Sequence, residues 1–192
     1  MRSLNICIDI DGTITDSYYW LDFCNEHFST NITEADVTAH SMHEVLGVDE
    51  DEFLKFYERN KLKFHSNQKV REDAGPIIRG LSCYHNIYFV TARDEGLTMF
   101  THGFLRKNEI PYDRLFVLGT PNKVQKAEAV KCDVFIEDSY DNAIQLSEAG
   151  YAVLLLDACY NRKPINGNIT RVNTWNEIND IISGLAEENK AM

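Results

Sequence analysis

Residues 4–13 read Leu-Asn-Ile-Cys-Ile-Asp-Ile-Asp-Gly-Thr, and this stretch decides how the rest of the chain is interpreted. Isoleucine recurs at every second position of residues 4–10, which predicts a short buried strand over that range. Gly12 and Thr13 follow at once and indicate a sharp turn, because glycine adopts backbone conformations that other residues avoid. Residues two apart in an extended chain point to the same side, so we expect the carboxylates of Asp9 and Asp11 to face one region.

Four later segments share the apolar character of this first strand, and helical patterns lie between them. Strands that alternate with helices favour a parallel sheet covered by helices on both faces. We therefore predict an α/β fold of three layers with a Rossmann-like parallel sheet. The further strands are expected at 86–91, 114–118, 133–136 and 151–156, and the helices at 76–84, 95–108, 122–131, 140–149 and 174–185.

Residues 16–73 interrupt this alternation, because they contain helical stretches and no convincing strand. Thr33 and Asp49 are typical of positions at which a helix begins. Aromatic side chains recur through the segment, as a small helical unit with a core of its own requires. We predict a core domain of residues 1–15 and 74–192, with a helical cap of residues 16–73 inserted after the first strand.

The composition limits the class of protein. A chain of 192 residues with 44% apolar and 26% charged residues is long enough for one folded core and a modest insertion. The net charge of -11 repels polyanions, which argues against nucleic acid or an anionic membrane surface as a partner. Five cysteines are scattered singly, which indicates neither a zinc site nor a disulfide framework. No apolar stretch suits a spanning helix or a signal peptide, so we expect a cytoplasmic protein.

Functional groups of a parallel sheet gather at the carboxyl ends of its strands, and several polar residues of this chain are expected there. Asp9 and Asp11 follow the first strand, Thr91 ends the second, and Glu137 and Asp138 follow the fourth. Carboxylates held close together raise each other's proton affinity unless a cation lies between them. Oxygen ligands with open positions suit Mg²⁺, which keeps several waters and accepts substrate phosphate.

The sequence Asp-Ile-Asp-Gly-Thr at 9–13 resembles the first motif of the haloacid dehalogenase superfamily of phosphatases. The resemblance implies the core fold of that superfamily. It also implies that Asp9 attacks phosphorus to form an aspartyl-phosphate, while Asp11 acts first as a general acid and then as a base. Thr13 is expected to orient Asp11 by a hydrogen bond.

The later motifs of the superfamily match in the expected order. Thr91 resembles the residue that donates a hydrogen bond to a phosphoryl oxygen, and Lys123 resembles the lysine that holds the nucleophile and the phosphoryl group. Asp138 resembles a metal ligand that acts together with the Asp9 side chain and the backbone carbonyl of Asp11. The resemblance therefore implies Mg²⁺ as the cofactor, with Asp9, Asp11 and Asp138 as its ligands.

For some positions in these motifs the sequence allows two interpretations. Lys126 competes with Lys123 for the lysine role, and we favour Lys123 because it stands at the predicted helix start. Glu137 departs from the paired aspartates of relatives and either binds the metal through water or orients a metal-bound water. Asp141 or Asn142 either supports the metal site or only caps the following helix.

The cap carries the information about substrate. The helical insertion and the sequences Val-Thr-Ala-Arg-Asp and Phe-Ile-Glu-Asp-Ser together resemble bacterial relatives of the 5'(3')-deoxyribonucleotidases, in which cap aromatics stack on a nucleobase. Tyr19 and Trp20 follow the first motif closely enough for that role. Ala92 is expected beside the phosphate, and Arg93 either binds substrate or pairs with an acid.

Three hypotheses follow from these residues. The first is a magnesium-dependent phosphomonoester hydrolase whose small phosphorylated substrate is a nucleoside monophosphate. The second keeps the mechanism and changes the substrate to a sugar phosphate or another small metabolite. The third is a non-catalytic binding protein, which the complete set of motif residues argues against. The oligomeric state leaves no trace in the sequence.

Overall fold

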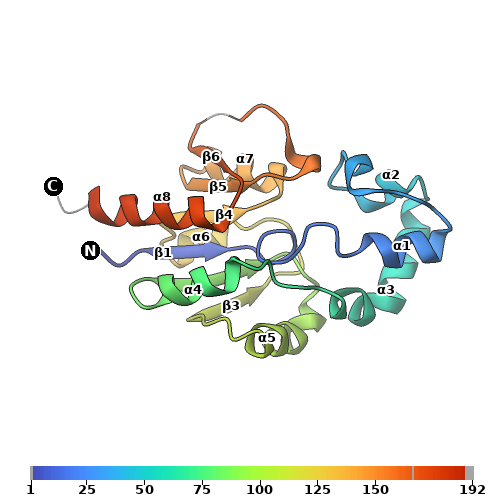
Figure 1. The fold of residues 1–192 in the computed structure, drawn as a ribbon, viewed down its shortest axis with the longest axis horizontal. Coiled ribbons are helices and arrows are strands. Elements are labelled where there is room, and N and C mark those ends of the chain that lie inside the picture. Colours follow the sequence, from blue (N-terminus) through green and yellow to red (C-terminus); the bar gives the residue numbers. More distant parts are fainter. Residues whose placement is uncertain (1, 166, 189–192) are drawn as a thin grey trace.

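A parallel sheet forms the centre of the computed structural model, which describes residues 2–165 and 167–188. Its strands are Asn5–Ile8 (β1), Asn86–Thr91 (β2), Arg114–Val117 (β3), Val134–Glu137 (β4), Ala152–Leu156 (β5) and Ile169–Val172 (β6). Their order across the sheet is β3-β2-β1-β4-β5-β6, and each neighbouring pair runs parallel. The first strand therefore lies between β2 and β4, at the point where the order reverses (Figure 1).

The structure confirms the five predicted strands and adds a sixth. β1 ends at Ile8, two residues earlier than predicted, although the amide of Asp9 still donates to the Ile136 carbonyl at 3.0 Å. β6 lies at the edge of the sheet beside β5, and only Ile169 and Val172 of its four residues are buried. Its sequence therefore lacks the apolar run by which the central strands are recognised.

Helices cover both faces of the sheet (Figure 1). Ile6 and Ile8 of β1 belong to the apolar cluster on one face, and Cys7 belongs to the cluster on the other. This arrangement confirms the predicted three-layer α/β fold with a Rossmann-like sheet. The isoleucine side is covered by Ala74–Ser82 (α4), Thr98–Lys107 (α5) and Trp175–Glu188 (α8), and the Cys7 side by Val124–Ala129 (α6) and Tyr140–Glu148 (α7).

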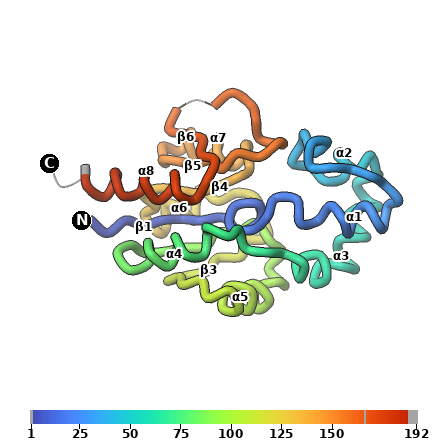
Figure 2. The backbone as a smooth tube through the Cα atoms, viewed as in Figure 1, coloured from blue at the N-terminus to red at the C-terminus, as the bar shows by residue number. Residues whose placement is uncertain are grey.

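A smaller group of helices lies beyond the carboxyl ends of the strands (Figures 1 and 2). It has an apolar cluster of its own, which includes Trp20 and Phe56 and also Tyr160 from the loop after β5. As predicted, its longest helix begins after Asp49, whose side chain accepts a hydrogen bond from the amide of Glu52 at 3.2 Å. The elements are Leu21–Phe28 (α1), a short 3₁₀ turn at Glu34–Asp36, Met42–Leu46 (α2) and Glu50–Ser66 (α3).

Two neighbouring segments join these helices to the sheet. Thr15 and Val70 form an antiparallel bridge, and the amide of Arg71 donates to the Ile14 carbonyl at 2.9 Å. The Arg71 guanidinium also donates to the carbonyl of Gly12 at 3.0 Å. The return segment from the helices therefore contacts the loop that follows β1.

Among the residues that the structure describes, no helix is both long enough and apolar enough to cross a membrane. The five cysteines are free thiols. Residues 189–192, at the end of the predicted core domain, lie outside the described residues.

His85 gives the stability of the fold a dependence on pH. The residue is 6% exposed, its Nδ1 accepts a hydrogen bond from the amide of Leu4 at 3.2 Å, and burial lowers its pKa below the ordinary 6.5. The unfolded chain therefore binds a proton more readily at this site than the folded chain does. We expect the free energy of unfolding to fall as the pH drops below about 6.5.

Urea titrations at several pH values between about 7.5 and 5.5 test this expectation. The variant His85→Asn keeps a hydrogen-bond acceptor for Leu4 but does not titrate, so its stability should fall less over the same range. An equal fall in both proteins would contradict the assignment to His85.

Candidate active site

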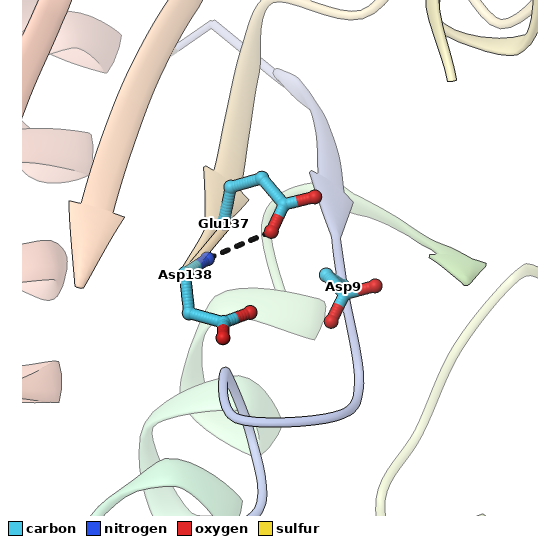
Figure 3. A group of neighbouring side chains, drawn as sticks. All are labelled: Asp9, Glu137 and Asp138. Carbon is cyan, nitrogen blue, oxygen red and sulfur yellow. Dashed lines mark hydrogen bonds between the residues drawn. The ribbon is translucent and has the colours of Figure 1, made fainter. Parts of the chain in front are cut away.

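Three carboxylates meet where β1 and β4 end. The side chains of Asp9, Glu137 and Asp138 offer oxygen atoms that all lie within 4.8 Å of one another (Figure 3). The register explains this, because Ile8 pairs with Ile136 and the two chains therefore leave the sheet side by side. All three acids are buried, with Asp9 only 5% exposed.

Lys123 provides the positive charge that faces this cluster. It is 2% exposed and stands directly before α6, and its Nζ donates to Oδ1 of Asp9 and, at 2.7 Å, to Oε1 of Glu137. Although burial disfavours the ammonium, the two carboxylates raise the pKa of Lys123 above its ordinary value. Lys126, the competing candidate, instead places its Nζ 4.6 Å from the ring centre of Phe116.

Glu137 has donors on both of its oxygens. Oε2 accepts from the amides of Asp138 and Ser139 at 2.7 and 2.9 Å, and Oε1 accepts from Lys123 and, at 2.8 Å, from Asn142. Burial would raise its pKa, but Lys123 and these donors hold the pKa below its ordinary value. Glu137 therefore fixes the loop after β4 and the position of Lys123.

Asp138 is held by residues from distant parts of the chain. Thr13 donates to its Oδ1 at 3.0 Å, Tyr160 donates to its Oδ2, and the Asn161 side chain donates to its backbone carbonyl at 2.7 Å. The hydrogen bond from Thr13 corrects the expectation that this residue orients Asp11. The cause is Gly12, whose positive φ of 84° turns the chain toward the end of β4.

The charges of the cluster are not balanced by the protein alone. Burial raises the pKa of Asp9 well above its ordinary value. The positive charge of Lys123 lowers this pKa, whereas the negative charges of Glu137 and Asp138 raise it further. Burial and Glu137 likewise raise the pKa of Asp138 to about 6. Three carboxylates beside one ammonium form an oxygen-only donor set with excess negative charge. Such a set fits a divalent cation.

Asp11 lies outside that cluster and faces the segments that flank α1 and α3. Arg93 binds both of its oxygens, with Nε 2.7 Å from Oδ2 and Nη2 2.8 Å from Oδ1. The amide of Gln68 donates to the same Oδ1, and the Tyr19 hydroxyl lies 3.5 Å from it. Burial opposes ionisation, but Arg93 holds the pKa of Asp11 well below its ordinary value. Arg93 was expected either to bind substrate or to pair with an acid, and the structure shows it paired with Asp11.

A cavity of about 340 Å³ opens over these groups. Its lining includes Asp9 and Lys123 from the cluster and Thr91 and Ala92 from the end of β2. Thr91 is buried, and its hydroxyl accepts a hydrogen bond from the amide of Arg93 at 3.3 Å. The chain thus brings together at one cavity the residues that the motifs predicted for phosphate binding.

A second pocket of about 100 Å³ adjoins the site on the cap side. Tyr19 and Trp20 line it together with Asp11 and Asp138. Trp20 is only 3% exposed, and its indole donates to the Ser17 carbonyl at 3.2 Å, so most of this ring belongs to the cap core. Tyr19 is the more accessible of the two aromatic residues.

Several residues that hold the site were not predicted from the sequence. Gln68 and Arg71 come from the segment that returns from the cap, and Tyr160 and Asn161 come from a 3₁₀ turn after β5. None belongs to a recognisable motif. The sequence feature that could have predicted them is their position in loops directly after helices or strands that end near the site.

Comparisons with known proteins agree with this geometry. A family model described as "5' nucleotidase, deoxy (Pyrimidine), cytosolic type C protein" matches residues 2–188. A nucleotidase of Clostridium acetobutylicum is 54% identical over 192 residues, which are 100% of both chains.

Two solved structures share the fold. A haloacid dehalogenase-like hydrolase of Streptococcus pneumoniae has a TM-score of 0.70 at 15% identity and covers 94% of this chain and 98% of its own. YfnB of Bacillus subtilis, described as a HAD-hydrolase and solved with bound magnesium, has a TM-score of 0.62 at 16% identity, with 95% and 100% covered. At these identities the likeness concerns the fold.

The turn at Gly12 should not accept a side chain. A Cβ there would lie 2.8 Å from both Cγ of Asp138 and the Tyr160 hydroxyl, in a backbone conformation with positive φ. We expect Gly12→Ala to lower the free energy of unfolding by at least about 2 kcal/mol and to displace Asp138.

Gly47→Ala is the matched control for this prediction, measured by urea unfolding. Gly47 also has a positive φ, of 67°, but nothing lies within 4 Å of a Cβ there, so the loss should be about 1 kcal/mol. Equal losses in the two variants would show that the close approach to Asp138 is unimportant.

Proposed function

Because the chain belongs to the family of 5'-nucleotidases, deoxy (pyrimidine), cytosolic type C, we propose that it is a magnesium-dependent hydrolase that releases phosphate from (deoxy)nucleoside monophosphates through an aspartyl-phosphate. The family match, the nucleotidase relative and the shared fold confirm the predicted superfamily and the prediction of a phosphatase.

One observation carries the proposed mechanism. Asp9, at the end of the central strand, is held by Lys123 at the floor of a cavity that Thr91 also lines. A carboxylate oxygen of Asp9 attacks phosphorus, and the bond between phosphorus and the ester oxygen breaks. The protonated form of Asp11 would give its proton to the departing alkoxide, which requires Arg93 to release the carboxylate. In the second step Asp11 takes a proton from water, the water oxygen attacks phosphorus, and Asp9 is released.

Lys123 and Thr91 would bind the phosphoryl group in both steps. The ammonium neutralises charge on the nucleophile and on the phosphoryl oxygens, and the Thr91 hydroxyl donates a hydrogen bond to one of those oxygens. Ala92 lines the same cavity, and its backbone amide would be a further donor to the phosphoryl group. These groups are placed before substrate arrives, so little reorganisation is needed during the reaction.

The carboxylates of Asp9 and Asp138 and the backbone carbonyl of Asp11 would hold Mg²⁺. A bound Mg²⁺ neutralises phosphoryl charge and lets a carboxylate approach phosphorus. The buried oxygen-only cluster with its excess of negative charge supports this assignment. The magnesium in the YfnB structure is consistent with it. Glu137, whose oxygens are occupied by donors, would support the site without binding the ion directly.

The family and the Clostridium relative support a nucleotide substrate. In this proposal residues 16–73 act as a cap on a core of residues 1–15 and 74–192. The pocket beside Asp11, of about 100 Å³, has room for only part of a nucleoside, with Tyr19 as the side chain that would contact it and Trp20 as the wall behind. Arg93 would reach the substrate only by leaving Asp11. We propose a cytoplasmic location on the basis of the family.

Removal of the nucleophile should abolish turnover. We expect Asp9→Asn to lower kcat for p-nitrophenyl phosphate by on the order of 10³ or more, because an amide does not attack phosphorus. Asp180→Asn changes an exposed aspartate of α8 in the same way and should leave kcat unchanged. Chelation with EDTA should abolish activity, and added Mg²⁺ should restore it. Full activity in Asp9→Asn or in EDTA would contradict the mechanism.

A panel of substrates tests the proposed specificity. Phosphate release from nucleoside and deoxynucleoside monophosphates should exceed release from sugar phosphates at equal concentration, because the pocket beside Asp11 is lined by aromatic side chains. Higher kcat/KM for sugar phosphates would favour the second hypothesis. Absence of turnover on the whole panel with Mg²⁺ present would favour a binding protein.

A further inference from the structure

We infer that Tyr160 is a positioning residue for the metal site, and that its hydroxyl holds the Asp138 carboxylate in the orientation that binds Mg²⁺. The inference rests on the proposed function, because it concerns the proposed metal ligand Asp138. Tyr160 lies in the 3₁₀ turn Cys159–Asn161 after β5 and is 7% exposed. It is not one of the proposed ligands.

Two hydrogen bonds fix the side chain of Asp138. The Tyr160 hydroxyl donates to Oδ2, and the Thr13 hydroxyl donates to Oδ1 at 3.0 Å. One oxygen of this carboxylate also lies within 4.8 Å of oxygens offered by Asp9 and Glu137. Like charges at this distance repel one another, so a carboxylate without such donors would turn away from the cluster. The two hydroxyls therefore keep the Asp138 carboxylate beside its acidic neighbours (Figure 3).

These donors leave Asp138 able to bind an ion. A carboxylate has about four lone pairs that can accept hydrogen bonds or bind a metal. The four hydrogen bonds to Glu137 use all of them, two on each oxygen. Within residues 2–165 and 167–188, the Asp138 side chain accepts one hydrogen bond on each oxygen, which leaves each oxygen a lone pair for the ion. Tyr160 can therefore hold the carboxylate without taking the position of the metal.

The turn that carries Tyr160 is itself held in place. Asn161, the next residue, is buried, and its side-chain amide donates to the backbone carbonyls of Asp138 and Leu156, both at 2.7 Å. Its side-chain oxygen accepts a hydrogen bond from Nη1 of Arg171 at 2.6 Å. Two successive residues of one turn thus hold the side chain and the backbone of Asp138. The position of the Tyr160 hydroxyl is therefore fixed relative to this ligand.

The ring of Tyr160 packs among the smaller group of helices. It belongs to their apolar cluster, together with Trp20. Tyr18 meets the ring edge-on with the ring centres 6.2 Å apart, and His40 does so at 5.7 Å. Tyr160 thus spans from this cluster to Asp138, and the packing limits how far its hydroxyl can move. The smaller group of helices contributes to the metal site in this way, although none of the proposed ligands comes from it.

A fixed carboxylate matters more for Mg²⁺ than for Ca²⁺. Mg²⁺ requires nearly ideal octahedral geometry, whereas Ca²⁺ accepts irregular coordination. Replacement of a residue that orients a metal ligand typically lowers the affinity by about 10- to 100-fold. Loss of the Tyr160 hydroxyl should therefore weaken the binding of Mg²⁺ more than the binding of Ca²⁺. A general disturbance of the site would weaken both by the same factor.

The test is isothermal titration calorimetry of the full chain, freed of metal by chelation, with Mg²⁺ and separately with Ca²⁺. Tyr160→Phe keeps the ring and removes only the hydroxyl. We expect the Kd for Mg²⁺ to rise by at least about tenfold and the Kd for Ca²⁺ to rise by a smaller factor. Tyr160→Met, whose flexible apolar side chain can fill the same space, replaces Tyr160→Phe if that variant does not fold.

Tyr112→Phe is the matched control. It removes a hydroxyl that is hydrogen-bonded to Nδ1 of His102 in α5 at 2.6 Å, and it should leave both Kd values unchanged. In Tyr160→Phe, an unchanged or lower Kd for Mg²⁺, or a rise for Ca²⁺ that equals or exceeds the rise for Mg²⁺, would overturn the inference while leaving the proposed hydrolase intact. A wild-type protein that does not bind Mg²⁺ would instead refute the proposed metal site, and the inference with it.

Discussion

The ion pair between the buried ammonium of Lys123 and the carboxylates of Asp9 and Glu137 is the interaction on which the site depends. Charges removed from water are costly unless they are paired, and the loss of one partner of a buried pair costs about 3–5 kcal/mol. Here the pairing brings the start of α6 to the ends of β1 and β4. Glu137 also holds the loop after β4 in place, because its second carboxylate oxygen accepts hydrogen bonds from the amides of Asp138 and Ser139.

The two aspartates of the first motif are separated by their surroundings. Asp9 lies among acids in the core, where burial and like charges raise its pKa, whereas Asp11 faces Arg93, which holds its pKa low. Environments that differ in this way allow two neighbouring carboxyl groups to take different roles. Gly12 makes the separation possible, since its positive φ turns the chain sharply after Asp11.

The fold could be predicted from the sequence wherever a strand shows an apolar pattern within its own few residues. The central strands β1 and β4 show apolar runs that end in acids, and their parallel pairing places Asp9, Glu137 and Asp138 together. The edge strand β6 escaped prediction because half of its residues are not buried. The first motif indicated two aspartates on one side of the chain, but the turn at Gly12 gives them different neighbours.

The sequence by itself determined the class of fold and the superfamily and predicted the reactive groups, because strand periodicity and strand-end motifs depend on residues close together in the chain. Only the tertiary structure decided which side chains hold those groups. Gln68 is 57 positions from Asp11, and Thr13 is 125 positions from Asp138. Such contacts depend on how the cap docks and how loops turn, and hydrogen bonds require distances and angles that no local pattern records.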